Sequence, residues 1–182
     1  MNVYRFVSTA VVAAALAATA AGCGGGTSAE ETWAGDVCSA LTDWKSTIQQ
    51  ASDDVRAKLQ SPQVGMLAPI KADVNKAVGA TTKLASDLKA LQPPDTDEGT
   101  QAKQEIDALA NHLQTTAQTA KQTTANVAEG ATPTEIVSAL APLAPALQSL
   151  AVKTSSTLAA IQDTGKAMKD GFAKADACKP YR

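Results

Sequence analysis

Apolar residues recur every three or four positions through four long stretches of this chain. In the first stretch these positions are Trp33, Val37, Leu41, Trp44, Ile48, Ala51, Val55 and Leu59. Such spacing places all of them on one face of an α-helix, whereas a strand needs strict alternation. A sheet would also require more β-branched and aromatic residues than this chain contains, since aromatics are only 3% of it. We therefore predict an all-α fold.

Three further stretches repeat the pattern, and proline or glycine separates them. They cover residues 67–91, 102–127 and 136–172. Ser61-Pro62 and Gln92-Pro93-Pro94 are the first two breaks, because proline cannot continue a helix interior. Gly130 is expected to cap the third helix at its C-terminus. Pro142 and Pro145 interrupt the fourth stretch, which predicts either a kink or a short helix followed by a long one.

Four amphipathic helices with short connections predict an up-down-up-down four-helix bundle over residues 30–182. An up-up-down-down arrangement would need long crossovers that these connections do not provide. The same periodicity is compatible with a long coiled coil, but no apolar stripe continues through its proline break. In the bundle, the start of the first helix and the end of the fourth lie at the same end.

The first 22 residues have the pattern of a secretory signal. Met1 to Arg5 carries one positive side chain, and Phe6 to Ala21 is an almost continuous run of apolar residues. This run is shorter than the roughly 20 apolar residues of a membrane-spanning helix. We exclude residues 1–22 from the folded domain and expect residues 23–29, which are rich in glycine, to form a flexible tether.

The residues around the end of this signal resemble the bacterial lipobox, Leu-Ala/Ser-Gly/Ala-Cys. Here the sequence is Ala20-Ala21-Gly22-Cys23, so three of the four positions fit and Ala20 departs from the pattern. The resemblance implies that Cys23 is lipidated and becomes the first residue of a protein anchored to the outer face of the cell membrane. The alternative is cleavage by ordinary signal peptidase after Ala20 or Ala21, which would give a secreted protein.

Cysteine parity supports the lipobox interpretation, because three cysteines outside the cytoplasm leave one without a partner. Lipidation of Cys23 accounts for the odd one and leaves Cys38 and Cys178 to form a disulfide across the two ends of the domain. In the chain-entropy model a bridge closing so long a loop contributes about 4 to 5 kcal/mol. Without a Cys/His cluster in the sequence, a metal site is not expected.

Charge argues against nucleic acid as a partner. Loss of Arg5 with the signal leaves 15 basic residues against 18 acidic ones, a formal net charge of −3, with both signs scattered along the chain. A nucleic-acid-binding domain would show a basic stripe. No cofactor motif is present either.

Two candidate chemical sites are weak. His112, the single histidine, could act as a general base, but Leu113 occupies the core position beside it, so His112 is expected on a solvated flank. The acidic run from Asp95 to Glu98 could bind a hard cation, yet it lacks calcium-loop spacing and is explained by the dipole of the helix that follows. We predict no catalytic residue and no metal ligand.

Threonines on the core stripes raise a different possibility. Thr116 and Thr154 lie beside small residues such as Ala120, so the middle of the bundle should be narrow-walled and less apolar. Either the helices close together and fill the space, or a modest cavity remains that takes a small or lipid-like ligand.

The mature chain resembles the small Ala/Thr-rich helical lipoproteins of high-GC Gram-positive bacteria. The likeness is carried by Trp33-Ala34-Gly35-Asp36-Val37-Cys38, by Trp44, and by residues 172–178 before Lys179-Pro180. It implies a helical lipoprotein of the cell envelope and adds little on function. The anchor and the lack of a catalytic constellation in the sequence favour a non-enzymatic binding or interaction module. The expected partners are the membrane, through the N-terminal lipid, and an envelope protein or a small apolar ligand. The alternative function is a carrier or sensor of an apolar or lipid-like ligand held in the bundle core, and an enzyme ranks third.

Overall fold

The computed structural model describes residues 26–61 and 63–182, and all regular structure within them is helical. The predicted all-α fold is therefore confirmed. Six α-helices and one 3₁₀ helix follow one another: α1 (Ala29–Gln60), α2 (Leu67–Ala90), α3 (Asp97–Ala125), α4 (Pro133–Leu140), α5 (Leu143–Gln162), α6 (Lys166–Lys174) and η1 (Asp176–Tyr181). Ala29, assigned by prediction to the tether, is already the first residue of α1.

Side-chain caps fix where several helices begin. Ser28 Oγ accepts a hydrogen bond from the Glu31 backbone N–H at 3.1 Å, so the first turn of α1 has one of its otherwise unsatisfied amides paired. Thr132 forms a full capping box with Glu135: the Thr132 backbone N–H donates to the Glu135 carboxylate at 2.7 Å, and Thr132 Oγ1 accepts from the Glu135 N–H. In both caps the hydroxyl lies three residues before the amide that it pairs, a spacing that can be read from the sequence.

The first two predicted breaks are confirmed. Between α1 and α2 the chain turns through Gly65, whose φ of 84° is in the left-handed region that glycine tolerates best. α2 ends at Ala90, ahead of Pro93 and Pro94. α3 then begins after Thr96, whose hydroxyl accepts from the Gly99 N–H at 2.9 Å.

The predicted end of the third helix at Gly130 is wrong. α3 ends at Ala125, with Asn126 as the capping residue, and Gly130 lies in the following turn without a positive φ. The reason is packing: Val127 turns away from the helix and is buried with Ile136 and Leu140 of α4. That contact draws the chain out of the helix before glycine is reached.

The fourth stretch divides more often than predicted. Pro142 separates the short α4 from the longer α5, which is one of the two expected outcomes. The stretch then breaks again after Gln162, so the expectation that Met168 and Phe172 continue the same helix is wrong. At Gly165 the chain passes so close to α3 that a Cβ would lie 2.0 Å from the Glu98 carboxyl group. Glycine allows this close approach, and the chain turns there into α6.

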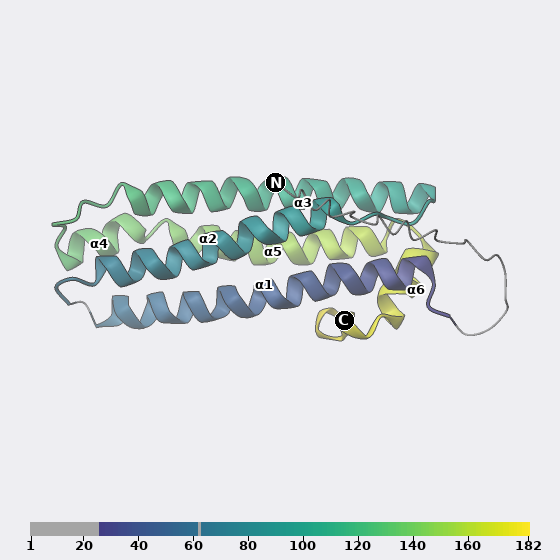
Figure 1. Ribbon diagram of the computed structural model, residues 1–182, viewed down its shortest axis with the longest axis horizontal. Helices are drawn as coiled ribbons and strands as arrows, with labels where there is room; N and C mark the ends of the chain where they lie inside the picture. Colours follow the sequence, from purple (N-terminus) through teal and green to yellow (C-terminus); the bar gives the residue numbers. More distant parts are fainter. Residues whose placement is uncertain (1–25, 62) are drawn as a thin grey trace, which may run out of the picture.

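Figure 1 shows α1, α2, α3 and α5 extended along the long axis of the molecule, with α6 at one end and the C-terminal segment beside α1. Neighbours in space are largely neighbours in sequence: α2 packs against both α1 and α3, and α3 against α5. α6 and η1 pack against α1. Gly171 makes this approach close, since a Cβ there would lie 2.8 Å from the Glu30 carbonyl carbon.

The buried side chains form two separate groups. The larger, which we call the disulfide-end core, surrounds Cys38 and Cys178 and includes Trp33, whose ring meets that of Phe172 edge-on at 6.2 Å. The smaller, the distal core, lies at the other end and consists of Met66, Leu67, Ile70, Val74, Val127, Ile136 and Leu140. The two groups are separate clusters, and a space lies between them.

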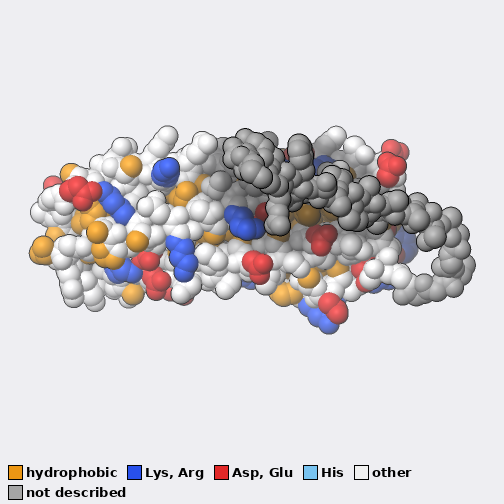
Figure 2. All heavy atoms as spheres, in the orientation of Figure 1, with side chains coloured by type: hydrophobic (Ala, Val, Ile, Leu, Met, Phe, Trp, Pro, Cys, Tyr) orange, Lys and Arg blue, Asp and Glu red, His pale blue; other side chains and the backbone are white. Residues whose placement is uncertain are grey.

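The surface carries charges of both signs. On the face shown in Figure 2, acidic and basic side chains are interspersed and hydrophobic side chains gather only in small groups. Of the helices that the structure describes, none combines the length and apolar character needed to cross a bilayer.

Candidate functional site

A cavity of about 440 Å³ lies between the disulfide-end core and the distal core, and we call it the apolar cavity. Side chains from α1, α2, α3, α4 and α5 surround it, and it is partly open to the exterior. Most of its walls are aliphatic: Ile48, Ala51, Val55, Leu59, Val74, Ala77, Val78, Ala117, Ala120, Leu140, Leu143, Ala146 and Leu150. The space therefore suits an apolar ligand.

Alanines explain why this space is not filled. At this level of the molecule the inward positions are occupied by Ala51 on α1, Ala77 on α2, Ala117 and Ala120 on α3, and Ala146 on α5. Because the backbones are held apart by larger residues above and below, the short side chains leave a void between them. Ile48, Val55 and Leu59 continue the apolar stripe of α1 but are only partly buried, since they face this void.

A second pocket of about 560 Å³ lies further along α1 and α5, and we call it the polar pocket. It is lined by Leu41, Trp44, Lys45, Thr154, Ser155, Leu158, Ala159, Gln162, Asp163, Lys169, Pro180 and Tyr181. Among the described residues the backbones of α1 and α5 make few close approaches. Both cavities border the line along which α1 and α5 face each other, and we call this line the seam.

The core threonines are satisfied largely by their own helices. Buried Thr154 donates to the Leu150 carbonyl at 2.8 Å, and buried Thr124 donates to the Ala120 carbonyl at 2.8 Å. Thr116 lines the apolar cavity beside Ala117 and Ala120. Thr154 lines the polar pocket instead, so the two threonines do not share one cavity. Of the two outcomes expected for the middle of the molecule, the open cavity is the one observed.

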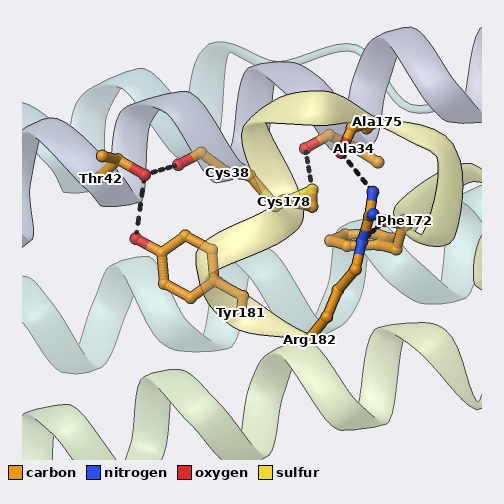
Figure 3. The surroundings of a disulfide bond; sticks show 8 residues. All are labelled: Ala34, Cys38, Thr42, Phe172, Ala175, Cys178, Tyr181 and Arg182. Carbon is orange, nitrogen blue, oxygen red and sulfur yellow. Dashed lines mark hydrogen bonds between the residues drawn. A yellow bond between two sulfur atoms is a disulfide. The ribbon is translucent and has the colours of Figure 1, made fainter.

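The disulfide between Cys38 and Cys178 is present, as predicted, with the two Cα atoms 5.1 Å apart. It joins α1 to η1 across 140 residues of sequence. Figure 3 shows the bridge enclosed by α1 and the C-terminal segment, with Cys178 Sγ 3.2 Å from the Ala34 carbonyl oxygen. A bridged sulfur carries no proton, so this is a packing contact. Both cysteines are fully buried.

The last residues of the chain hold this segment in place. Arg182 donates from Nε to the Phe172 carbonyl at 3.3 Å and from its terminal guanidinium nitrogen to the Ala175 carbonyl at 2.6 Å. The guanidinium thereby pairs carbonyls at the C-terminal end of α6. Figure 3 places the Tyr181 ring on the other side, its hydroxyl 3.3 Å from Thr42 Oγ1 on α1.

Burial raises the pKa of Tyr181, because desolvation disfavours the phenolate. The hydrogen bond with Thr42 opposes this shift and the negative charge of Asp43 adds to it. Lys45 Nζ lies 5.7 Å from the centre of the same ring. Tyr181 thus closes one side of the polar pocket.

The other predicted candidates are not brought together. Cys23, the predicted lipidation site, lies outside the described residues. His112 is half-buried, and its Nε2 atom is enclosed without a polar partner among the described residues, so the expectation of a solvated flank is wrong for that atom. Asp97 and Glu98 lie in the first turn of α3, as expected for helix-dipole stabilisation. No cluster of potential metal ligands occurs in the described ranges.

Sequence reasoning missed most of the cavity walls and, of the residues that line the polar pocket, indicated only Thr154 as a candidate. The sequence does show alanines at inward positions of successive helices. Whether these alanines meet at one level and leave a cavity depends on how the helices are aligned along the molecule, which the sequence does not show. Nothing in the sequence marks Lys45 and Lys169, because they line the same pocket only after α6 folds back toward α1. Comparison with protein-family models, with curated proteins and with solved structures finds no match for this chain.

Proposed function

We propose that this protein is a non-enzymatic lipoprotein of the cell envelope that carries or senses a small apolar ligand in the apolar cavity. In this proposal Cys23 anchors it to the outer face of the membrane, and α1, α2, α3 and the α4–α5 pair form an up-down-up-down four-helix bundle. The contacts between helices that follow one another in sequence support that topology. The lipobox-like residues before Cys23 and the buried disulfide support an extracytoplasmic location.

The observation that carries the proposal is the apolar cavity itself. Its volume of about 440 Å³ falls within the range of roughly 300 to 1,000 Å³ that is usual for small-molecule sites. Its aliphatic walls offer burial worth about 0.8 kcal/mol for each methylene that enters. Thr81 and Thr116 are among its few polar neighbours, and Thr81 already uses its hydroxyl within the protein.

The carrier function is favoured here over an interaction module because the two differ in what they require of the core. A module that binds through its surface has no need of a void, and a void of this kind lowers stability by about 24 cal/mol per Å³ when it is created in a filled core. An interaction module therefore becomes the better explanation only if the cavity binds nothing.

The test is extraction of the protein from its own membrane, followed by mass spectrometry of any co-purified apolar compound. Ala51→Leu and Ala120→Leu together should narrow the cavity, lower the amount of co-purified compound, and leave thermal stability unchanged or raised. Ala57→Leu on α1 and Ala108→Leu on α3 are matched controls, because both alanines are exposed and outside the cavity. If wild type carries no compound and binds no apolar probe, the proposal is wrong.

A further inference from the structure

We infer that the ligand is an anionic amphiphile, with its hydrocarbon chain in the apolar cavity and its head group in the polar pocket beside Lys45 and Lys169. This inference rests on the proposed function and specifies the ligand class. It comes from three observations: the alignment of the two cavities, the chemistry of their walls, and the state of the lysines.

The cavities follow one another along the same seam. On α1, Ile48 lines the apolar cavity and Trp44 lines the polar pocket; on α5, Leu150 lines the first and Thr154 the second. Each pair is four residues apart, which is about one helical turn. Both cavities are partly open to the exterior. A single extended chain can therefore reach from one to the other along the seam.

The walls change character along this path. Most residues around the apolar cavity are aliphatic, and its polar ones are Ser52, Arg56, Gln60, Asp73, Thr81 and Thr116. The polar pocket presents hydroxyl groups from Thr154, Ser155 and Tyr181 together with two ammonium groups and one carboxylate, that of Asp163. Hydroxyl and ammonium groups are the donors that a carboxylate or phosphate oxygen requires. A neutral or cationic head group would give neither ammonium group in the wall of the pocket an anionic partner.

Six of the thirteen lysines pair with a carboxylate, and the two at this pocket are not among them. Lys58, Lys71, Lys83, Lys103, Lys166 and Lys179 each pair with a carboxylate. Lys45 and Lys169 form no ion pair with any residue in the described ranges, and Lys45 instead lies over the Tyr181 ring. Lys121 and Lys174 are equally without an ion pair in the described ranges, so it is the place of Lys45 and Lys169 in the wall of the polar pocket that makes them available to an anionic ligand.

Charges at the rim of the apolar cavity are already compensated. Asp73 is paired with Lys58 at 2.6 Å, and Arg56 lies 3.9 Å from Asp53 on the same helix. The end of the hydrocarbon chain is therefore expected at the rim of the apolar cavity, and the head group in the polar pocket. Carboxylate and phosphate heads share the required chemistry, and the experiment separates them.

The experiment is calorimetric titration of the delipidated mature protein with three probes of equal chain length: dodecanoate, dodecyl phosphate and dodecanol. Wild type should bind at least one of the anions about tenfold more tightly than the alcohol, and the tighter of the two identifies the head group. The double variant Lys45→Gln/Lys169→Gln should lose this advantage, about tenfold, while dodecanol affinity is unchanged. Lys121→Gln/Lys174→Gln removes the same charge at exposed positions outside both cavities and should bind as wild type does.

The outcomes separate the two proposals. If wild type binds dodecanol and Ala51→Leu abolishes that binding, the carrier function holds whatever the lysine variants do. The amphiphile inference alone is overturned if neither anion binds more tightly than the alcohol, or if the Lys45/Lys169 variant loses no more anion affinity than the control variant. Absence of binding by every probe overturns both.

Discussion

Trp44 Nε1 donates a hydrogen bond to Thr81 Oγ1 at 3.1 Å, and this buried contact joins α1 to α2. The Thr81 hydroxyl in turn donates to the Ala77 carbonyl at 2.8 Å, so its lone pairs are left to accept the indole N–H. Trp44 borders the polar pocket and Thr81 the apolar cavity. The bond therefore marks the level at which one cavity gives way to the other.

Thr81→Val should destabilise the protein by about 1 to 3 kcal/mol, because it leaves the Trp44 N–H buried without its acceptor. Urea unfolding followed by tryptophan fluorescence measures the change. Thr154→Val is the matched control, since the Thr154 hydroxyl bonds only the Leu150 carbonyl of its own helix. If both variants lose the same free energy of unfolding, the Trp44–Thr81 hydrogen bond between α1 and α2 adds no stability of its own.

Replacing both Cys38 and Cys178 with alanine should lower stability by about 4 to 5 kcal/mol, as the chain-entropy model gives for a loop of about 140 residues. The loss should be accompanied by faster amide hydrogen exchange in α6 and η1, because these helices pack mainly on α1. Exchange measured by mass spectrometry resolves this segment. Unchanged protection there would mean that Phe172, Arg182 and their contacts hold the segment without the bridge.

Tyr181 should ionise above the usual tyrosine pKa of about 10. Since the folded state holds the phenol proton more tightly than the unfolded state does, its contribution to stability is full below that value and is lost as the pH rises through the higher folded pKa. Tyr4 is the other tyrosine and belongs to the predicted signal, so absorbance of the mature protein reports Tyr181 alone.

Two neighbours of Tyr181 should move this pKa in opposite directions. Asp43→Asn removes a negative charge that raises the pKa, so ionisation should shift to lower pH; Thr42→Val removes a hydrogen bond that lowers it, so ionisation should shift to higher pH. The same absorbance titration measures both variants. Shifts of the same sign in the two would contradict the assignment of causes.

Cys23→Ser should release the protein from the membrane fraction, because a lipid chain has no other site of attachment in the lipobox-like sequence. Intact-mass analysis of the membrane-extracted wild type should give a chain that begins at Cys23 and carries added lipid, with two hydrogen atoms fewer than the reduced chain because of the disulfide. A wild-type chain found in the medium that begins at Ala21 or Gly22 would instead establish ordinary secretion.

Helix positions could be predicted because their causes are local. The three-four spacing of apolar residues, the Ser28 and Thr132 caps and the prolines at 62, 93 and 142 all act within a few residues of themselves. The two failures have long-range causes. Val127 leaves α3 to pack with α4, and the chain breaks at Gly165, where a Cβ would meet the Glu98 carboxyl group of α3.

The candidate site depended still more on tertiary structure. Thr116 and Ala120 indicated a weak place in the core, but Ala51, Ala77 and Ala146 reach the same void only through the register between helices. Cys38 and Cys178 were predictable because parity and compartment constrain cysteines strongly. Lys45 and Lys169 resemble any other surface lysines until the fold brings them to one pocket.

The Cys38–Cys178 bridge lies near one end of the molecule, so the two ends are restrained to different extents. Val55, beside the apolar cavity, is roughly 25 Å from Cys38 along the axis of α1 at 1.5 Å per residue. The cross-link restrains one end, whereas the distal core is small and is joined to the rest around a void. Helix ends at the distal side can therefore separate briefly without unfolding the bridged end. Such opening would give the proposed ligand a way in and out while the bridged end stays intact.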